Sequence, residues 1–245
     1  MKICVAQTKP VKGDIRKNIE DHKKLIALAV SNKADTVIFP ELSLTGYEPE
    51  LANELATDSN DPVLDDFQKI SNAKQITIGI GMPVKTNSGI LISMILFQPQ
   101  KTREIYSKQY LHPDEYPYFV PGQAQTPLME NGKKIAIGIC YELSVPEHSE
   151  KAYKEGAKIY IASVAKSVNG VEKAIKTLSE IANHYSMTVL MSNCIGYCDN
   201  FECGGKTSIW NNKGVLLGQL NDSNEGVVII DTDTQELIEK TIPNN

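Results

Sequence analysis

The sequence predicts an α/β protein in which two sheets pack face to face and each sheet carries helices on its outer side. Short apolar runs typical of buried strands alternate with amphipathic helical runs along most of the 245 residues. Each half of the chain has the same order of elements, strand, helix, strand, helix, strand and hairpin, although no sequence repeat is visible. Hydrophobic residues make up 41% of the chain and charged residues 22%, so the core can be sizeable. Two half-chain sheets, each covered by helices on one side, would bury their apolar strands between them.

The first half begins with a buried strand and an amphipathic helix. The apolar residues that follow Asp14 recur at helical spacing, and Asp14 can cap that helix. Asp61-Pro62 begins a second helix. The last two strands of this half flank Pro99-Gln100-Lys101, which predicts a hairpin. The strands are expected at residues 3–6, 36–39, 76–80, 90–97 and 103–107.

The second half repeats this order of elements. Helices are expected at residues 146–155, where Gly156 is a natural stop, and at residues 171–185. The turn Asn211-Asn212-Lys213-Gly214 predicts a hairpin. The strands are expected at residues 134–139, 159–163, 188–192, 207–210, 215–219 and 226–231. No linker rich in Pro, Gly or Ser separates the halves, so we expect a single domain over residues 1–245, with long functional loops at residues 43–62 and 110–131.

Composition and charge exclude several classes of protein. The net charge of −5 argues against a nucleic-acid partner, which usually needs a basic stripe on the protein. No apolar run approaches the roughly 20 residues of a membrane span, and the N-terminus lacks the pattern of a signal peptide. The five cysteines are an odd number, which is typical of a reduced protein rather than of a disulfide scaffold. We therefore expect a cytoplasmic protein with no nucleic-acid or membrane partner.

Three chemically reactive residues share one placement, directly after a strand-like run. Glu41 follows the first-half strand that ends at Phe39, Lys108 follows the strand that ends at Ser107, and Cys140 follows Ile139. Ligands of open α/β sheets gather at the carboxyl ends of strands, so the three side chains could converge on one pocket. Taken singly, each has a plainer interpretation: a solvated turn glutamate, a surface lysine, and a buried cysteine that packs as a small apolar residue.

The segments around these residues resemble the three catalytic motifs of the nitrilase superfamily of carbon–nitrogen hydrolases. The glutamate motif corresponds to Phe39-Pro40-Glu41-Leu42-Ser43-Leu44-Thr45-Gly46-Tyr47. The lysine motif corresponds to Tyr106-Ser107-Lys108-Gln109-Tyr110-Leu111, and the cysteine motif to Gly138-Ile139-Cys140-Tyr141-Glu142. Pro146-Glu147 stands where members of the superfamily often have that pair. The order and spacing of the motifs agree, and the resemblance runs over nearly the whole chain.

The resemblance implies a four-layer α-β-β-α sandwich of two mixed sheets, usually dimerised, and a Glu–Lys–Cys triad. Cys140 would be the nucleophile, Glu41 the general base and Lys108 a fixed positive charge near the oxyanion. The backbone N–H of Tyr141 would be a second donor to that oxyanion. A thioester would form on Cys140 as ammonia or an amine leaves, and water activated by Glu41 would release the carboxylate. We therefore expect a homodimer or higher homo-oligomer that acts on a small-molecule amide.

Four further residues are expected to bind substrate. Residues 111–122 resemble the part of the superfamily that carries a second glutamate, which implies that Glu115 positions substrate or supports the lysine. Tyr47, Tyr141 and Glu142 belong to the motifs themselves and are expected at the pocket. His112 is tempting as a base for the cysteine, but the superfamily has a glutamate in that role, so we expect no more than a supporting position for His112.

Cys194, Cys198 and Cys203 form a loose cluster in the sequence. Their spacing matches no tight zinc pattern and no histidine follows nearby, so ordinary core thiols are favoured over a metal site or a redox pair. The sequence also shows no nucleotide, flavin or phosphate loop. We therefore expect no metal and no cofactor.

The residues favour an amide substrate but leave other carbon–nitrogen bonds open. Tyr141 resembles many amidases, whereas Glu142, in place of the commoner aspartate, occurs more often near nitrilase cysteines. The long C-terminal extension of typical nitrilases is not present in the 245 residues, which favours an amide over a nitrile and leaves a carbamoyl amine open. The acidic loop at Asp114-Glu115, together with Glu142 and Glu147, favours a cationic or neutral substrate over a dicarboxylate.

Two interpretations from other classes stay open at this point. A non-catalytic binding scaffold on the same fold would have no need of the three triad positions, all of which are present. A cysteine protease is disfavoured because no histidine lies in a papain-like or caspase-like motif.

Overall fold

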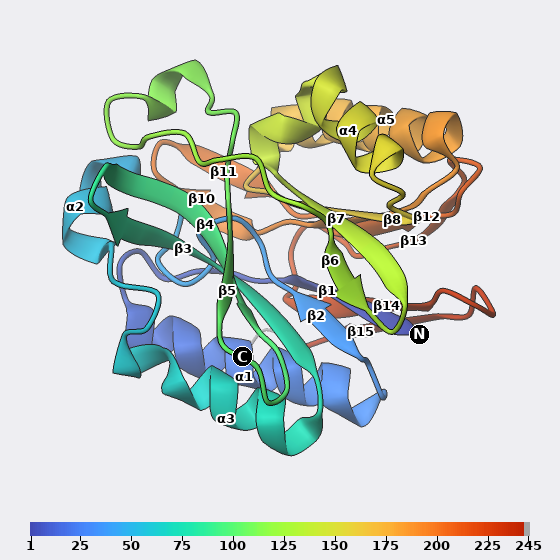
Figure 1. The fold of residues 1–245 in the computed structure, drawn as a ribbon, viewed down its shortest axis with the longest axis horizontal. Helices are drawn as coiled ribbons and strands as arrows, with labels where there is room; N and C mark the ends of the chain where they lie inside the picture. The colour runs from blue at the N-terminus through green and yellow to red at the C-terminus, as the bar shows by residue number, and fades with distance from the viewer. Residues whose placement is uncertain (243–245) are drawn as a thin grey trace.

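The computed structural model describes residues 1–242 and contains two large sheets stacked between two pairs of helices (Figure 1). The strands of the larger sheet are β1 (Lys2–Gln7), β2 (Thr36–Ile38), β3 (Thr77–Thr86), β4 (Gly89–Phe97), β5 (Glu104–Ser107), β14 (Gly226–Asp231) and β15 (Leu237–Thr241). They form a seven-stranded sheet in the order β15-β14-β1-β2-β3-β4-β5. Strands β1, β2 and β3 are parallel and the other neighbours are antiparallel, so the sheet is mixed.

The smaller sheet is also mixed. Its strands are β6 (Leu128–Glu130), β7 (Lys133–Ile139), β8 (Ile159–Ser163), β9 (Thr188–Ser192), β12 (Ser208–Trp210) and β13 (Leu216–Gln219). They form a six-stranded sheet in the order β13-β12-β9-β8-β7-β6, with β7, β8 and β9 parallel. A separate two-stranded sheet joins β10 (Ile195–Cys198) to β11 (Phe201–Gly204).

Two helices cover the outer face of each large sheet (Figure 1). Helices α1 (Ile15–Ser31) and α3 (Asp65–Lys74) lie on the seven-stranded sheet, and α4 (Pro146–Lys154) and α5 (Val168–Tyr185) lie on the six-stranded sheet. Helix α1 begins where the sequence predicts, because the side chain of Asp14 accepts a hydrogen bond from the Lys17 N–H at 3.0 Å. The shorter helical segments are η1 (Pro49–Leu51), α2 (Ala52–Leu55), η2 (Pro62–Leu64), η3 (Pro113–Glu115) and η4 (Cys140–Ser144).

Alternation along the strands divides the core into three apolar layers. In β1, Ile3 and Val5 belong to the layer between the two sheets, whereas Cys4 and Ala6 belong to the layer under α1 and α3. A third layer fills the space between the six-stranded sheet and helices α4 and α5. This arrangement confirms the predicted α-β-β-α sandwich of two mixed sheets.

The structure also differs from the prediction in several elements. The strands predicted at residues 159–163, 188–192 and 226–231 have the predicted bounds. The last of these, β14, joins the sheet of the first half, where it pairs with β1 in antiparallel register. The short strands β6, β10, β11 and β15 are absent from the prediction. The last three residues of the predicted domain, 243–245, lie outside the residues that the structure describes.

Within residues 1–242, none of the helices combines the length and the apolar character that a membrane crossing requires.

Candidate active site

Two loops that follow strands bring a buried ion cluster together. Glu41 lies beyond the end of β2, Lys108 directly after β5, and Glu115 at the end of the short segment η3. The ammonium Nζ of Lys108 donates to Glu41 Oε1 at 2.7 Å and to Glu115 Oε1 at 2.6 Å. The side chains of all three residues are at most 1% exposed. One buried ammonium is therefore shared between two buried carboxylates.

The two carboxylates of this cluster differ in how they are satisfied. Glu115 Oε1 also accepts from the Tyr47 hydroxyl at 2.9 Å, and Glu115 Oε2 accepts from the His112 N–H at 2.8 Å. Glu41 Oε2 is buried and no donor of the described residues meets it in good hydrogen-bond geometry, although the Cys140 thiol is close enough to favour the ionised Glu41 carboxylate and so to lower its pKa. Because a buried acceptor without a partner normally costs stability, the open oxygen of Glu41 marks a place where a proton can be taken up.

Cys140 lies at the carboxyl end of β7, at the first position of η4. Its φ angle is +44°, in the left-handed region that residues other than glycine rarely adopt. Such backbone strain costs of order 1–3 kcal/mol and concentrates at functional sites. The next N–H, that of Tyr141, lies in the first turn of η4, where backbone donors have no partner within the helix.

Glu142 connects the cysteine turn to the lysine loop. Its Oε2 accepts from the Ile139 N–H at 2.7 Å, and its Oε1 accepts from the Gln109 N–H at 2.6 Å. The Tyr106 hydroxyl donates to Oε2 at 2.8 Å. These three bonds tie the residue before Cys140 to the residue after Lys108, so the carboxylate of Glu142 fixes the two loops relative to each other.

The placement of Glu142 corrects our expectation of a substrate contact. Its side chain is fully buried and does not line the cavity at Cys140. The physical reason is that both of its oxygens are already used by protein donors, which the sequence motif alone does not reveal. A structural role therefore replaces the substrate-binding role for Glu142.

The protonation states suit a thiol that must be activated on demand. Burial and the negative charge of Glu41 raise the pKa of Cys140 to about 11, against the opposing charges of Lys166 and Lys108. Burial also raises the pKa of Glu41, although the charge of Lys108 opposes this shift. Burial lowers the pKa of Lys108, but the charges of Glu41, Cys140 and Glu115 raise it further, so the net pKa lies above the ordinary value. At neutral pH the thiol keeps its proton and the lysine stays charged.

A cavity of about 470 Å³ opens in front of Cys140. Of the residues predicted to bind substrate, Tyr47, Glu115 and Tyr141 line it, and His112 lies at the same wall with its ring edge-on to Tyr141. The other lining residues are Pro49, Glu50, Asp114, Tyr118, Cys140, Ala165, Lys166, Ser167, Gly170, Asp199, Asn200 and Phe201. A site of this size suits a small molecule.

One charged wall residue is missing from the sequence prediction. Lys166 follows β8 by the same strand-exit placement that singled out Cys140, so the pattern was available in the sequence. Asn193 holds this wall, because its Oδ1 accepts from the Lys166 N–H at 2.9 Å and its Nδ2 donates to the Gly205 carbonyl at 2.7 Å. Asp199, Asn200 and Phe201 reach the cavity from the β10–β11 hairpin, which was not predicted either.

The two-sheet sandwich matches the fold of carbon–nitrogen hydrolases, and comparison with known families agrees. The carbon–nitrogen hydrolase family matches residues 2–240. The chain therefore belongs to the carbon–nitrogen hydrolase family, as its resemblance to the nitrilase superfamily implied.

Curated relatives have similar sequences over nearly the whole chain. The protein named "Hydrolase in agr operon" from Staphylococcus aureus is 24% identical over 97% of this chain and 93% of its own length. A glutamine-dependent NAD(+) synthetase from Acinetobacter baylyi is 25% identical over 96% of this chain but only 44% of its own length. The present chain thus corresponds to less than half of that synthetase.

Solved structures of an amidase from Nesterenkonia sp. AN1 share the fold. One of them, with the acetamide moiety of fluoroacetamide added covalently at the active-site cysteine, has a TM-score of 0.86 and 21% identity, covering 94% of this chain and 89% of that one. Another, in complex with butyramide, has a TM-score of 0.84 and 22% identity, covering 94% and 90% of the two chains.

Proposed function

We propose that the protein is a thiol-dependent hydrolase that cleaves the C–N bond of a small-molecule amide through a thioester on Cys140. The observation that supports this most directly is the buried cluster of Glu41, Lys108 and Glu115, whose charges act on a cysteine in the left-handed backbone region. Such a cluster is costly for folding, and polar arrangements of this kind concentrate at catalytic sites.

In the first half-reaction, Cys140 attacks the amide carbonyl. Glu41 takes the proton from the thiol as the S–C bond forms, so the thiolate exists only while it reacts. The ammonium of Lys108 and the N–H of Tyr141 stabilise the tetrahedral oxyanion. Glu41 then gives its proton to the amine as the C–N bond breaks, and ammonia or an amine leaves behind a thioester.

In the second half-reaction, water replaces the amine. Glu41 removes one proton from the water as the oxygen attacks the thioester carbonyl, and the same two donors stabilise the second oxyanion. Collapse breaks the C–S bond and releases the carboxylic acid, while the sulfur regains its proton. Glu115 would hold the Lys108 ammonium in place through both steps, because it is the fully satisfied partner of that lysine.

A neutral or cationic amide is the substrate class that we favour. The acidic side chains of Glu50, Asp114 and Asp199 lie on the cavity wall, against the single lysine Lys166. Clefts lined by one sign of charge concentrate ligands of the other sign. The motif residues discussed above favour amides over nitriles, and carbamoyl amines stay an alternative substrate class for the same triad.

The direct test is ammonia release from a panel of small amides, nitriles and carbamoyl amines, with the wild type beside Cys140→Ala. We expect activity on neutral or cationic amides, abolished by Cys140→Ala and retained in the matched control Cys4→Ala, which removes a buried thiol of β1. If the wild type releases no ammonia from any member of the panel and Cys140 does not react with a thiol reagent, a non-catalytic binding scaffold becomes the better interpretation.

An amide that carries a carboxylate is the second candidate, and Lys166 is the observation that favours it. Lys166 brings a positive charge to the cavity wall and acts electrostatically on Cys140. If such a substrate is the natural one, Lys166→Met should raise its KM about tenfold or more and leave the KM of acetamide unchanged. Equal effects on both substrates would exclude a contact between Lys166 and a substrate carboxylate.

Assembly and location belong to the same proposal. We propose a homodimer or higher homo-oligomer, on the basis of the superfamily resemblance. A cytoplasmic location is supported by the five cysteines, all of which are free thiols.

A further inference from the structure

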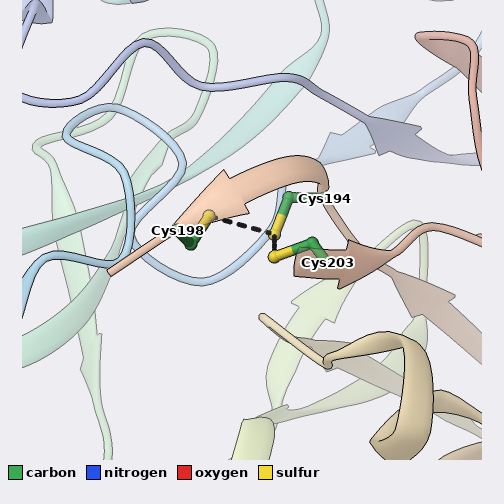
Figure 2. Close-up of side chains that lie close together, drawn as sticks. All are labelled: Cys194, Cys198 and Cys203. Carbon is green, nitrogen blue, oxygen red and sulfur yellow. Dashed lines mark hydrogen bonds between the residues drawn. The ribbon is translucent and has the colours of Figure 1, made fainter. Parts of the chain in front are cut away.

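Three cysteines outside the catalytic cluster converge at the β10–β11 hairpin (Figure 2). Cys194 directly precedes β10, Cys198 ends it, and Cys203 lies in β11 opposite Gly196. The sulfur of Cys194 lies 2.9 Å from that of Cys203 and 4.0 Å from that of Cys198. All three sulfurs lie within 4.8 Å of one another, so the side chains point to one spot from two strands.

The burial of the three thiols is nearly complete. Their exposed fractions are 1% for Cys194, 1% for Cys198 and 2% for Cys203. The Cys194–Cys203 separation is shorter than the about 3.5–4.0 Å at which non-bonded carbon atoms pack, although sulfur is the larger atom. Cysteines that serve only as small apolar residues have no reason to bring three sulfurs this close.

A disulfide explains this geometry less well than a shared ligand. A disulfide would use two of the thiols and leave the third buried beside it. Three thiolates around a zinc-sized ion, with bonds of about 2.3 Å, would place their sulfurs about 3.8 Å apart. Each of the three sulfur–sulfur distances would therefore change by about 1 Å or less on binding.

We propose that Cys194, Cys198 and Cys203 bind one thiophilic divalent ion of the zinc group as three thiolates. In the described part of the chain no histidine or carboxylate joins this group, so the fourth position of a tetrahedral ion would hold water or a small ligand. A divalent ion compensates the three negative charges better than monovalent copper would. Binding displaces the thiol protons, and the site can load while the chain folds.

The position of this site connects it to the cavity wall. Hairpin β10–β11 is a two-stranded sheet, which is marginally stable by itself. Its turn carries Asp199 and Asn200 to the cavity, followed by Phe201, whose ring packs against Tyr47 at 5.8 Å between centroids. An ion that links both strands of the hairpin would hold this wall in one conformation.

The test uses the full-length Cys140→Ala variant, which lacks the cavity thiol. After incubation with Cd²⁺ or Zn²⁺ and desalting, we expect one ion per chain, with thiolate-to-metal charge-transfer absorption for Cd²⁺. Adding Cys198→Ser should weaken metal binding at least about a hundredfold. Loss of a residue that only hydrogen-bonds to a metal ligand already lowers metal affinity about 10–100-fold. Adding Cys4→Ser instead is the matched control, because Cys4 is an equally buried thiol outside the cluster, and the ion should be retained.

Circular dichroism of each variant shows whether it is folded, and Cys203→Ala provides a second ligand variant if Cys198→Ser is not. The proposal is wrong if the folded Cys140→Ala protein retains no ion, or retains it equally after Cys198→Ser and Cys203→Ala. A Cys194–Cys203 disulfide in the freshly isolated protein, detected by mass spectrometry, would likewise replace the metal site by a redox pair.

Discussion

Two buried glutamates lie on either side of the chemistry at Cys140 and are used in opposite ways. Glu41 shares the ammonium of Lys108 and keeps one oxygen without a hydrogen bond. Glu142 accepts three hydrogen bonds, from Ile139, Gln109 and Tyr106, and does not line the cavity at Cys140. Both are essentially inaccessible to solvent.

The two carboxylates are similarly buried and differ in how many of their hydrogen-bond acceptor positions are occupied. A satisfied carboxylate stabilises the loops that it joins, whereas an unsatisfied one is held at a cost in stability and is ready to exchange a proton. Substitutions of the two glutamates should therefore separate catalysis from stability.

The largest expected effect is on catalysis, from Glu41→Gln. The amide of the introduced Gln cannot accept the thiol proton. We therefore expect kcat to fall by about 10³–10⁴-fold, at the upper end of the range for loss of a general base. The free energy of unfolding should change by no more than about 1 kcal/mol, because Glu115 remains as a buried carboxylate partner of the Lys108 ammonium. Steady-state ammonia release and urea unfolding measure both quantities, and a Glu41→Gln protein with near-normal kcat would remove Glu41 from the reaction.

Glu142→Ala should show the reverse pattern. It leaves the N–H groups of Ile139 and Gln109 buried without acceptors, which should cost about 3 kcal/mol of unfolding free energy. The protein that stays folded should keep at least about tenfold more activity than Glu41→Gln, since the base is intact. Unchanged stability in urea unfolding would show that these bonds contribute little.

The pH dependence of stability sharpens the comparison. Burial raises the pKa of Glu142 to about 7, from 4.5 for an ordinary glutamate. Between these pH values the folded state holds a proton that the unfolded chain has lost, so the stabilising contribution is complete below pH 4.5 and is lost as the pH rises through about 7. Relative to Glu142→Gln, the wild type should lose about 3 kcal/mol of stability over this range.

The comparison with Glu142→Gln is needed because two histidines titrate in the same range. Burial lowers the pKa of His22 and of His148 to about 4, so both stabilise the fold increasingly as the pH rises from there. The trend of His22 is common to both proteins and cancels in the difference, and making the comparison in a His148→Gln background removes that of His148, whose Nε2 lies 3.7 Å from Glu142 Oε2. Parallel stability curves for the wild type and Glu142→Gln would contradict the raised pKa of Glu142.

The smallest expected effect concerns the reactivity of Cys140 itself. The charge of Glu41 contributes to the raised pKa of the Cys140 thiol, so Glu41→Gln should lower that pKa and speed alkylation by iodoacetamide at pH 8 by about three- to tenfold. The variant would then be more reactive towards a reagent and inactive towards an amide. Glu142→Gln should leave the alkylation rate unchanged, and mass spectrometry of the Cys140 peptide measures both.

The layered fold could be predicted from the sequence because the spacing of apolar residues indicates where the strands and helices lie and which of their faces are buried. Asp14 caps α1, and the buried runs of β8 and β9 have the predicted bounds. Periodicity does not encode which strand lies beside which, so the pairing of β14 with β1 could not be predicted. The extension of β3 across Pro83 was missed because proline usually interrupts a strand. Here the Pro83 carbonyl faces Thr57, on the side away from β4, so its missing N–H removes no bond to that strand.

The site was predictable only in part. The strand-exit placement indicated Glu41, Lys108 and Cys140, and the structure places them around one buried cluster. The same placement applied to Lys166, which the prediction overlooked. The direction in which Glu142 points depends on donors distant in sequence, Tyr106 in β5 and Gln109 in the loop after it, so a local motif could not reveal it. The convergence of the three hairpin cysteines depends on strand pairing for the same reason.

The pairing of β1 with β14 has a consequence for the order of events during synthesis. Lys2 pairs with Asp231, and Gln7 pairs with Gly226, so β1 leaves the ribosome long before the strand with which it pairs. Until then one edge of β1 is an open, apolar strand edge of the kind that attracts other chains. The seven-stranded sheet is thus completed late, at the entropic cost of closing the long loop that runs from β1 to β14. A nascent chain released before residue 226 would keep that edge open, and we expect it to depend on chaperones or to aggregate.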